Sequence, residues 1–110
     1  MTVAEYVTDR KYSMFVGAEW PMSILFIDQL ETGDYVTAVD SITIADETVV
    51  TKVVASEFTT NITQVDDDTA GANFTAVAAG HTSIQIKATT NNGLTLSDYV
   101  RVEVKAIPST

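Results

Sequence analysis

The strongest constraint on the fold is a pair of alternating segments near the C-terminal end of the chain, separated by a hairpin signal. In residues 82–89 and 99–106, apolar side chains occupy every second position, as expected for strands with one buried face. Asn92 and Gly93 stand between them, and this dipeptide favours a two-residue turn in which both residues take positive φ. The sequence therefore predicts a closing antiparallel hairpin, which stops near Pro108 because proline cannot donate to a sheet.

Turn signals divide the preceding part of the chain into further short strands. They recur at a spacing of about 8–12 residues, which is typical of a β-sandwich. Residues 66–71 (DDDTAG) have the composition of a polar loop, and no segment shows a sustained helical period. The predicted strands in this part are residues 23–28, 35–45, 49–55, 58–65 and 73–78. Together with the hairpin they predict an all-β, immunoglobulin-like sandwich of about seven strands.

The chain length of 110 residues corresponds to one ordinary domain. We expect residues 1–22 to form an N-terminal arm with one short strand near residues 11–16, residues 23–107 to form the sandwich, and residues 108–110 to form a C-terminal tail. Large aromatic side chains are frequent in the arm and suit contacts with a partner protein. The candidate contact residues are Tyr6, Tyr12, Phe15 and Trp20. The alternative is that the arm covers one end of the sandwich and buries Trp20 in its own core.

The composition excludes several classes of function. Fifteen acidic residues against six basic ones give a net charge of −9, which disfavours nucleic acids and anionic membranes and favours a basic partner or simple solubility. Cysteine is absent, so neither a disulfide nor a zinc–thiolate site can form. The start of the sequence does not resemble a signal peptide, and no apolar run approaches the length of a membrane span. We therefore expect synthesis in the cytoplasm without export.

The residues needed for catalysis do not form a recognisable motif. His81 is the single histidine, and it follows Gly80 at a predicted turn, where an exposed histidine without a catalytic role is common. A triad of Ser97, His81 and Asp98 can be written down, but no serine lies in a nucleophile motif. The sequence predicts that the protein is not an enzyme and needs no cofactor.

A run of three aspartates, residues 66–68, offers the hard oxygen ligands that calcium prefers. The spacing does not match an EF-hand loop, and consecutive aspartates point in different directions. Asp66 and Asp68 are the calcium candidates, and the alternative is a solvated acidic loop.

Two parts of the chain resemble the small immunoglobulin-like proteins of tailed phages called fibre–tail adaptors. The first comprises ILFIDQL at residues 24–30, GDYV at 33–36 and VDSITI at 39–44; the second comprises AGHTSI at 79–84, ATTNNGLT at 88–95 and VRVEV at 100–104. The matches extend over about residues 24–105, with a middle part that matches poorly. Phe26 stands near the usual tryptophan of the family, and Leu94 replaces its usual arginine.

The resemblance implies a virion protein without enzymatic activity, made in the cytoplasm of the host bacterium. It would be present in many copies and bind tail, neck, fibre or major capsid proteins, either as a fibre–tail or neck adaptor or as a protein that decorates and cements the capsid. The alternative is an adhesive or carbohydrate-binding immunoglobulin-like domain of a bacterial surface protein, because such domains have a similar closing hairpin.

Overall fold

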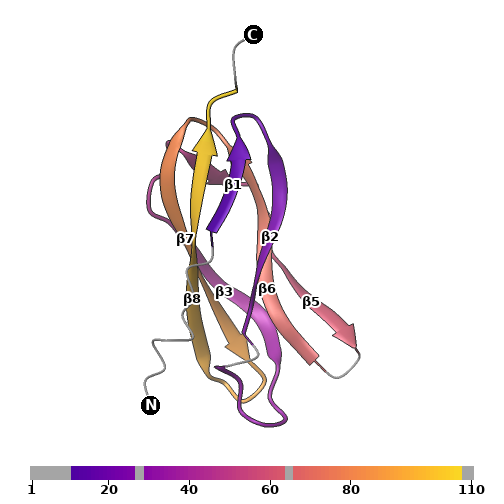
Figure 1. The fold of residues 1–110 in the computed structure, drawn as a ribbon. Coiled ribbons are helices and arrows are strands. Elements are labelled where there is room, and N and C mark those ends of the chain that lie inside the picture. The colour runs from indigo at the N-terminus through magenta and orange to yellow at the C-terminus, as the bar shows by residue number, and fades with distance from the viewer. Residues whose placement is uncertain (1–10, 27–28, 64–65, 108–110) are drawn as a thin grey trace.

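The computed structural model describes residues 11–26, 29–63 and 66–107; for residues 60–63 and 66–68 the description is limited to the backbone. In this part of the chain, eight strands form two facing sheets (Figure 1). They are β1 (Lys11–Phe15), β2 (Glu19–Leu25), β3 (Val36–Ile44), β4 (Val50–Lys52), β5 (Phe58–Thr63), β6 (Asp66–Ala76), β7 (Gly80–Thr90) and β8 (Thr95–Lys105). The all-β sandwich expected from the sequence is confirmed, with eight strands instead of about seven.

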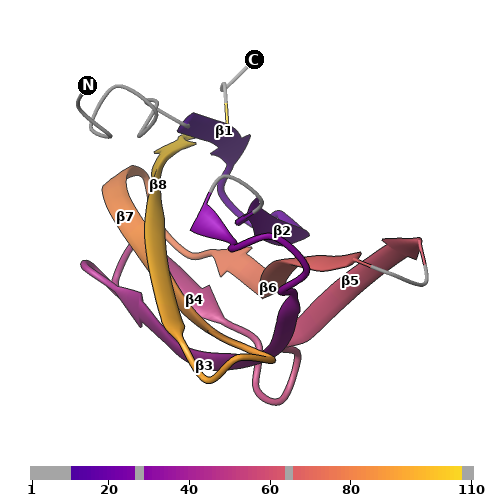
Figure 2. The same ribbon diagram turned by 90° about the horizontal axis from the view of Figure 1, so that it is seen from below.

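The first sheet has the order β1-β8-β7-β3, in which β1 runs parallel to β8 and the other pairs are antiparallel. In the second sheet β6 pairs with β2 along one edge and with both β4 and β5 along the other. β5 runs away from the rest of the sandwich (Figure 2). This division of the strands, with β3, β7 and β8 in one sheet and β2, β4 and β6 in the other, is that of an immunoglobulin-like sandwich.

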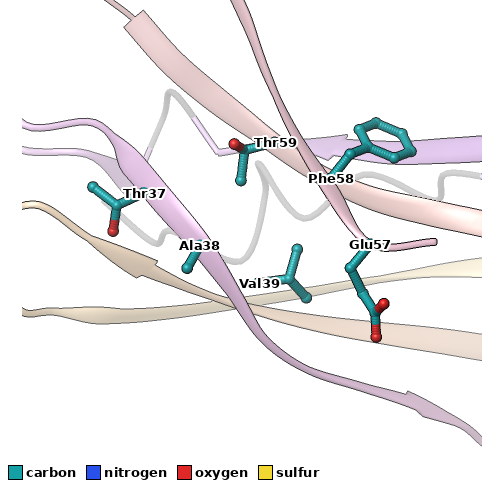
Figure 3. A pocket seen from close by; sticks show the side chains of 6 residues that line it. All are labelled: Thr37, Ala38, Val39, Glu57, Phe58 and Thr59. Carbon is teal, nitrogen blue, oxygen red and sulfur yellow. The ribbon is translucent and has the colours of Figure 1, made fainter. Parts of the chain in front are cut away.

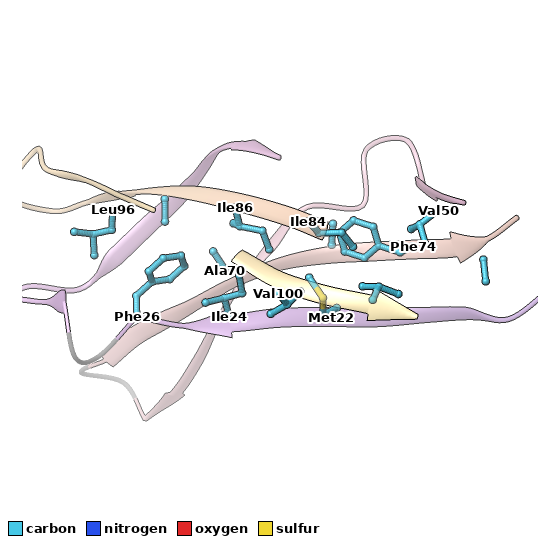
Figure 4. Close-up of a cluster of buried hydrophobic side chains, with 14 of the residues drawn as sticks. Met22, Ile24, Phe26, Val50, Ala70, Phe74, Ile84, Ile86, Leu96 and Val100 are labelled. Atoms are coloured by element: carbon cyan, nitrogen blue, oxygen red, sulfur yellow. The ribbon is translucent and has the colours of Figure 1, made fainter. Parts of the chain in front are cut away.

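Alternating apolar side chains from both sheets build one core (Figure 4). In β7 and β8 the buried positions are those predicted from the two-residue period, including Ile84, Ile86, Val100 and Val102. Removing a side chain of this size from water contributes about 1.5–3 kcal/mol. The core residues are Met22, Ile24, Phe26, Val36, Val49, Val50, Ala70, Ala72, Phe74, Ala76, Ile84, Ile86, Ala88, Leu96, Val100, Val102 and Val104.

The predicted hairpin is confirmed, but its turn type is not. Gly93 has a φ of 84°, whereas Asn92 is not among the described residues with positive φ. The ladder ends at the pair Thr89–Thr95, and the amide of Gly93 donates to the carbonyl of Thr90 at 3.0 Å. A longer loop of this kind needs positive φ at one residue only.

The largest correction concerns β6, which begins at Asp66 and not at residue 73. The predicted loop at residues 66–71 is therefore a strand. Gly71 is the reason that the pattern looked like a turn. Gly71 pairs with Ser23 of β2 on one side and with Phe58 of β5 on the other. A Cβ atom at this position would overlap the carbonyl of Met22 and the backbone of Ser23. The glycine allows close strand pairing and does not mark a turn.

The N-terminal part also differs from the expectation. The short strand near residues 11–16 is present as β1, but β2 already begins at Glu19, so residues 11–22 contribute strands to both sheets. Pro21 lies within β2, where it is tolerated because β2 pairs only with β6 in the described part of the chain. Residues 1–10 of the predicted arm and residues 108–110 of the predicted tail lie outside the described residues.

The remaining strands agree with the prediction within a few residues at each end. β4 is the exception, because it stops at Lys52 before a turn in which Ala55 has a φ of 59°. His81 was expected at a turn and is instead the second residue of β7. No helix among the described residues is long and apolar enough to cross a membrane.

Candidate protein-binding face

The outward positions of β1, β7 and β8 carry most of the positive charge of the protein. The register sets Lys11 beside Arg101, and Phe15 beside Lys105, while Lys87 projects from β7 on the same side of the sheet. All four basic residues are exposed, and those on β7 and β8 alternate with core residues. We call this surface the basic face. It holds four of the six lysine and arginine residues of the chain.

The charge of this face is opposite to that of the rest of the molecule. Glu103 is the one carboxylate at an outward position of β1, β7 and β8, so the face has a net charge of +3 with His81 neutral. Among the described side chains outside the face, eight carboxylates and Lys52 give a net charge of −7. Asp98 lies opposite the buried Ile86, at an inward position, and Asp40 lies on β3 at the margin of the sheet. The net charge of −9 therefore conceals a strong asymmetry between regions of the surface.

A small recess of about 140 Å³ lies on the basic face. It is lined by Lys11, His81 and Arg101, with Thr82 and Val102 beside them. Glu103 adjoins this cluster: Nζ of Lys11 is 3.2 Å from Oε1, and Nε2 of His81 is 3.7 Å from Oε2.

The electrostatics of the recess favour a bound carboxylate. The hydrogen bond that Lys11 donates and the positive charge of Lys11, with smaller contributions from Lys105 and His81, lower the pKa of Glu103 below its usual value, despite the opposing effect of burial. A carboxylate of the chain itself is thus held in its charged form by the side chains of this cluster. The same groups can attract a carboxylate of another molecule, because the face retains a surplus of positive charge.

Exposed aromatic side chains stand among these charges. Phe15 is 49% exposed at the β1 end of the face, and Tyr99 is 44% exposed near its centre, opposite Gln85. Aromatic residues and arginine are enriched in protein interfaces and supply much of their binding energy. A surface that combines Phe15, Tyr99 and Arg101 has the composition of an interface.

The four predicted contact residues have separate locations. Phe15 lies on the basic face, whereas Tyr12 pairs with the buried Val102, on the opposite side of β1, and is 37% exposed. Trp20 packs against the core, with its ring centroid 5.9 Å from that of Phe74, but it is only partly buried and is not one of the core residues. Tyr6 lies outside the described residues.

Sequence reasoning missed the basic face itself. A signal was present, because Tyr99, Arg101, Glu103 and Lys105 occupy alternate positions of the closing strand. Alternation showed that these side chains share a surface, but the parallel pairing of β1 with β8, which adds Lys11 and Phe15, depends on contacts between the two ends of the chain.

The described residues do not bring together Ser97, His81 and Asp98. His81 pairs with Glu103, whereas Ser97, six positions before Glu103 in β8, pairs with Lys87. At the rise of a β-strand this separates the two side chains by about 20 Å. The hydroxyl of Ser97 instead accepts a hydrogen bond from Nε2 of Gln85 at 2.9 Å.

The calcium candidates Asp66 and Asp68 lie in β6, where Asp66 pairs with Thr63 of β5. Their side chains are outside the described part of the structure, so calcium binding here stays a prediction. Elsewhere in the described part, histidine, aspartate and glutamate form no group of three that could hold a metal ion.

A second surface feature is a groove of about 230 Å³ between β3 and the start of β5 (Figure 3). In the described part of the chain β3 pairs only with β7, and β5 only with β6, so both strands present an open edge here. The edge of β3 is interrupted by two bulges near Ala38 and Asp40, a device that discourages pairing with another strand. The residues lining the groove are Thr37, Ala38, Val39, Glu57, Phe58 and Thr59.

Comparisons with known proteins give no family. No protein-family model matches the sequence, and no curated protein matches it. Among solved structures, the chain is similar to the solution structure of the PKD domain from the KIAA 1837 protein, with a TM-score of 0.40 and 14% sequence identity over 93% of this chain and 86% of that chain. This similarity is too low to support an argument about function.

Proposed function

We propose that this protein is a non-enzymatic assembly module that binds neighbouring proteins through its basic face. The observation that carries the proposal is the concentration of positive charge and exposed aromatic rings on one side of an otherwise acidic domain. Charge complementarity sets the orientation of partners and excludes wrong ones, while aromatic side chains and arginine supply affinity. The separation of His81 from Ser97 along the ladder supports a role without catalysis.

The proposed setting is the virion of a tailed phage. The resemblance of residues 24–44 and 79–104 to fibre–tail adaptors supports it, and either a fibre–tail or neck adaptor or a capsid-decorating protein fits a small domain with one binding face. The nature of the partner differs from the expectation based on total charge. A net charge of −9 favours a basic partner, whereas the basic face favours an acidic one.

Immunogold electron microscopy of intact particles, with an antibody against this chain, tests the proposed setting. Label at the tail or neck would support the adaptor, and label over the head would support a decorating protein. Label on the bacterial envelope, with none on particles, would refute the virion role and leave the adhesive or carbohydrate-binding surface domain as the explanation.

A further inference from the structure

We infer that the basic face of one copy binds the acidic surface of a second copy, in a head-to-tail arrangement. The inference rests on the proposed function in one respect, the use of this face for assembly. It adds the identity of the neighbour and the geometry of the contact.

Charge complementarity within the chain identifies the neighbour. The face carries +3, and the described side chains outside it carry −7. Described carboxylates outside the face include Glu19, Glu31, Asp46, Glu47 and Glu57, all of them exposed. A second copy therefore presents abundant carboxylates to Lys11, His81 and Arg101 in the recess.

The same charges determine the geometry. A two-fold dimer through the basic face would set Lys11, Lys87, Arg101 and Lys105 of one copy against the same residues of the other. Like charges brought together in this way cost several kcal/mol. The face must therefore meet a different region of the next copy, and such heterologous contacts build rings or open filaments instead of closed dimers.

The overall charge of the chain does not prevent this contact at physiological salt. Two copies at −9 repel each other over long distances, but charges further apart than about 8 Å are largely screened at 0.15 M ionic strength. Pairs in direct contact are screened much less. Association should therefore be measurable at 0.15 M salt and weaker at 1 M salt, where contact pairs are also weakened.

Sedimentation velocity of the full chain tests the inference at both salt concentrations. We expect association at 0.15 M salt that Arg101→Glu weakens by about tenfold or more. The pair Lys87→Glu with Lys105→Glu should have a similar effect, and circular dichroism establishes that each variant is folded. Lys52→Glu makes the same change of charge outside the basic face, beside Glu57, and is the matched control: it should associate at least as strongly as the unmodified chain.

A mixing experiment tests the head-to-tail geometry. Fluorescently labelled Arg101→Glu protein keeps its acidic surface, so it should still bind the face of an unmodified copy and sediment faster in the presence of excess unmodified chain. If the labelled variant stays monomeric in that mixture while the unmodified chain associates, the head-to-tail arrangement is wrong.

Two results would overturn the inference as a whole. One is an unmodified chain that stays monomeric at roughly 1 mM, the range of the weakest specific affinities. The other is equal weakening by Lys52→Glu and Arg101→Glu. A monomeric chain combined with gold label on particles would refute self-association and leave the proposed function intact. Salt-dependent oligomers without label on particles would support self-association and refute the virion setting.

Discussion

The outer faces of the two sheets differ in charge and aromatic content, although apolar residues from the inner faces of both sheets form one core. The face of β1, β7 and β8 carries Phe15, Tyr99 and four basic side chains. The outward positions of β2 and β6 include Ser23, Gly71, Asn73 and Thr75, and Glu19 is the one charged residue among the described outward side chains of these two strands. Burial requires alternate apolar residues in every strand, but the solvent side is free to vary. The contrast is the basis for proposing the face of β1, β7 and β8 as the binding surface.

The shared core should show the largest effect when it is altered. Phe74 is fully buried and packs against Trp20, so Phe74→Ala should lower the free energy of unfolding by about 3–5 kcal/mol. Urea denaturation followed by tryptophan fluorescence measures the change. A loss below about 1 kcal/mol would show that this ring does not connect the two sheets through the core.

The second sheet should depend on close backbone pairing. Gly71→Ala forces β2 away from β6, because the added Cβ overlaps the Met22 carbonyl, and we expect a loss of about 1–3 kcal/mol or more. Thermal denaturation measures it. Gly93→Ala is the matched control: open space surrounds the hairpin glycine, so only its positive φ should cost stability. If both variants lose the same stability, close packing is not the reason for Gly71.

Substitutions on the basic face should separate binding from stability. Lys87→Glu with Lys105→Glu removes charges that lie on the surface, so the free energy of unfolding should change by less than about 0.5 kcal/mol. Association or incorporation into particles should nevertheless fall. Urea denaturation and sedimentation, performed on the same preparation, measure the two effects. A large loss of stability with unchanged association would make the face structural.

The smallest expected effect is a change in the titration of Glu103. Lys11 lowers the pKa of Glu103 below its usual value of 4.5, so the stabilisation by this ion pair is present above pH 4.5 and is lost as the pH falls through the lower pKa of the folded protein. Lys11→Gln should move the pKa of Glu103 toward 4.5, as followed by NMR of its carboxyl carbon. The pKa of Glu57, which Lys52 lowers, should not change. An unchanged titration of Glu103 would show that Lys11 does not hold it.

The sequence predicts the fold well where periodicity is strict and poorly where small residues pack closely. The alternation in β7 and β8 gave the correct buried faces, because one face of each strand must be apolar. Residues 66–71 were predicted as a loop but belong to β6. Glycine is a common turn signal, whereas Gly71 is required here for close strand pairing. The turn after Thr90 was misjudged because its type depends on where the ladder ends.

The candidate site was predictable only in part. Phe15 was identified from composition and lies on the basic face, whereas Trp20 has the same chemical character and lies against the core. No local pattern distinguishes these two aromatics, since their environments depend on which sheet each strand joins. The charge asymmetry was also hidden, because Lys11, Lys87, Arg101 and Lys105 are distant in sequence and meet only through strand pairing.

The most direct test of the basic face as a binding surface is chemical footprinting of the four lysines. Reductive methylation followed by mass spectrometry gives, for each lysine, the ratio of its reactivity in assembled particles to that in the free chain. We predict strong protection of Lys11, Lys87 and Lys105, and an unchanged ratio for Lys52, which lies outside the face and pairs with Glu57 at 2.7 Å. Unprotected lysines on the face, with protection confined to Lys52 or absent from all four, would contradict the account.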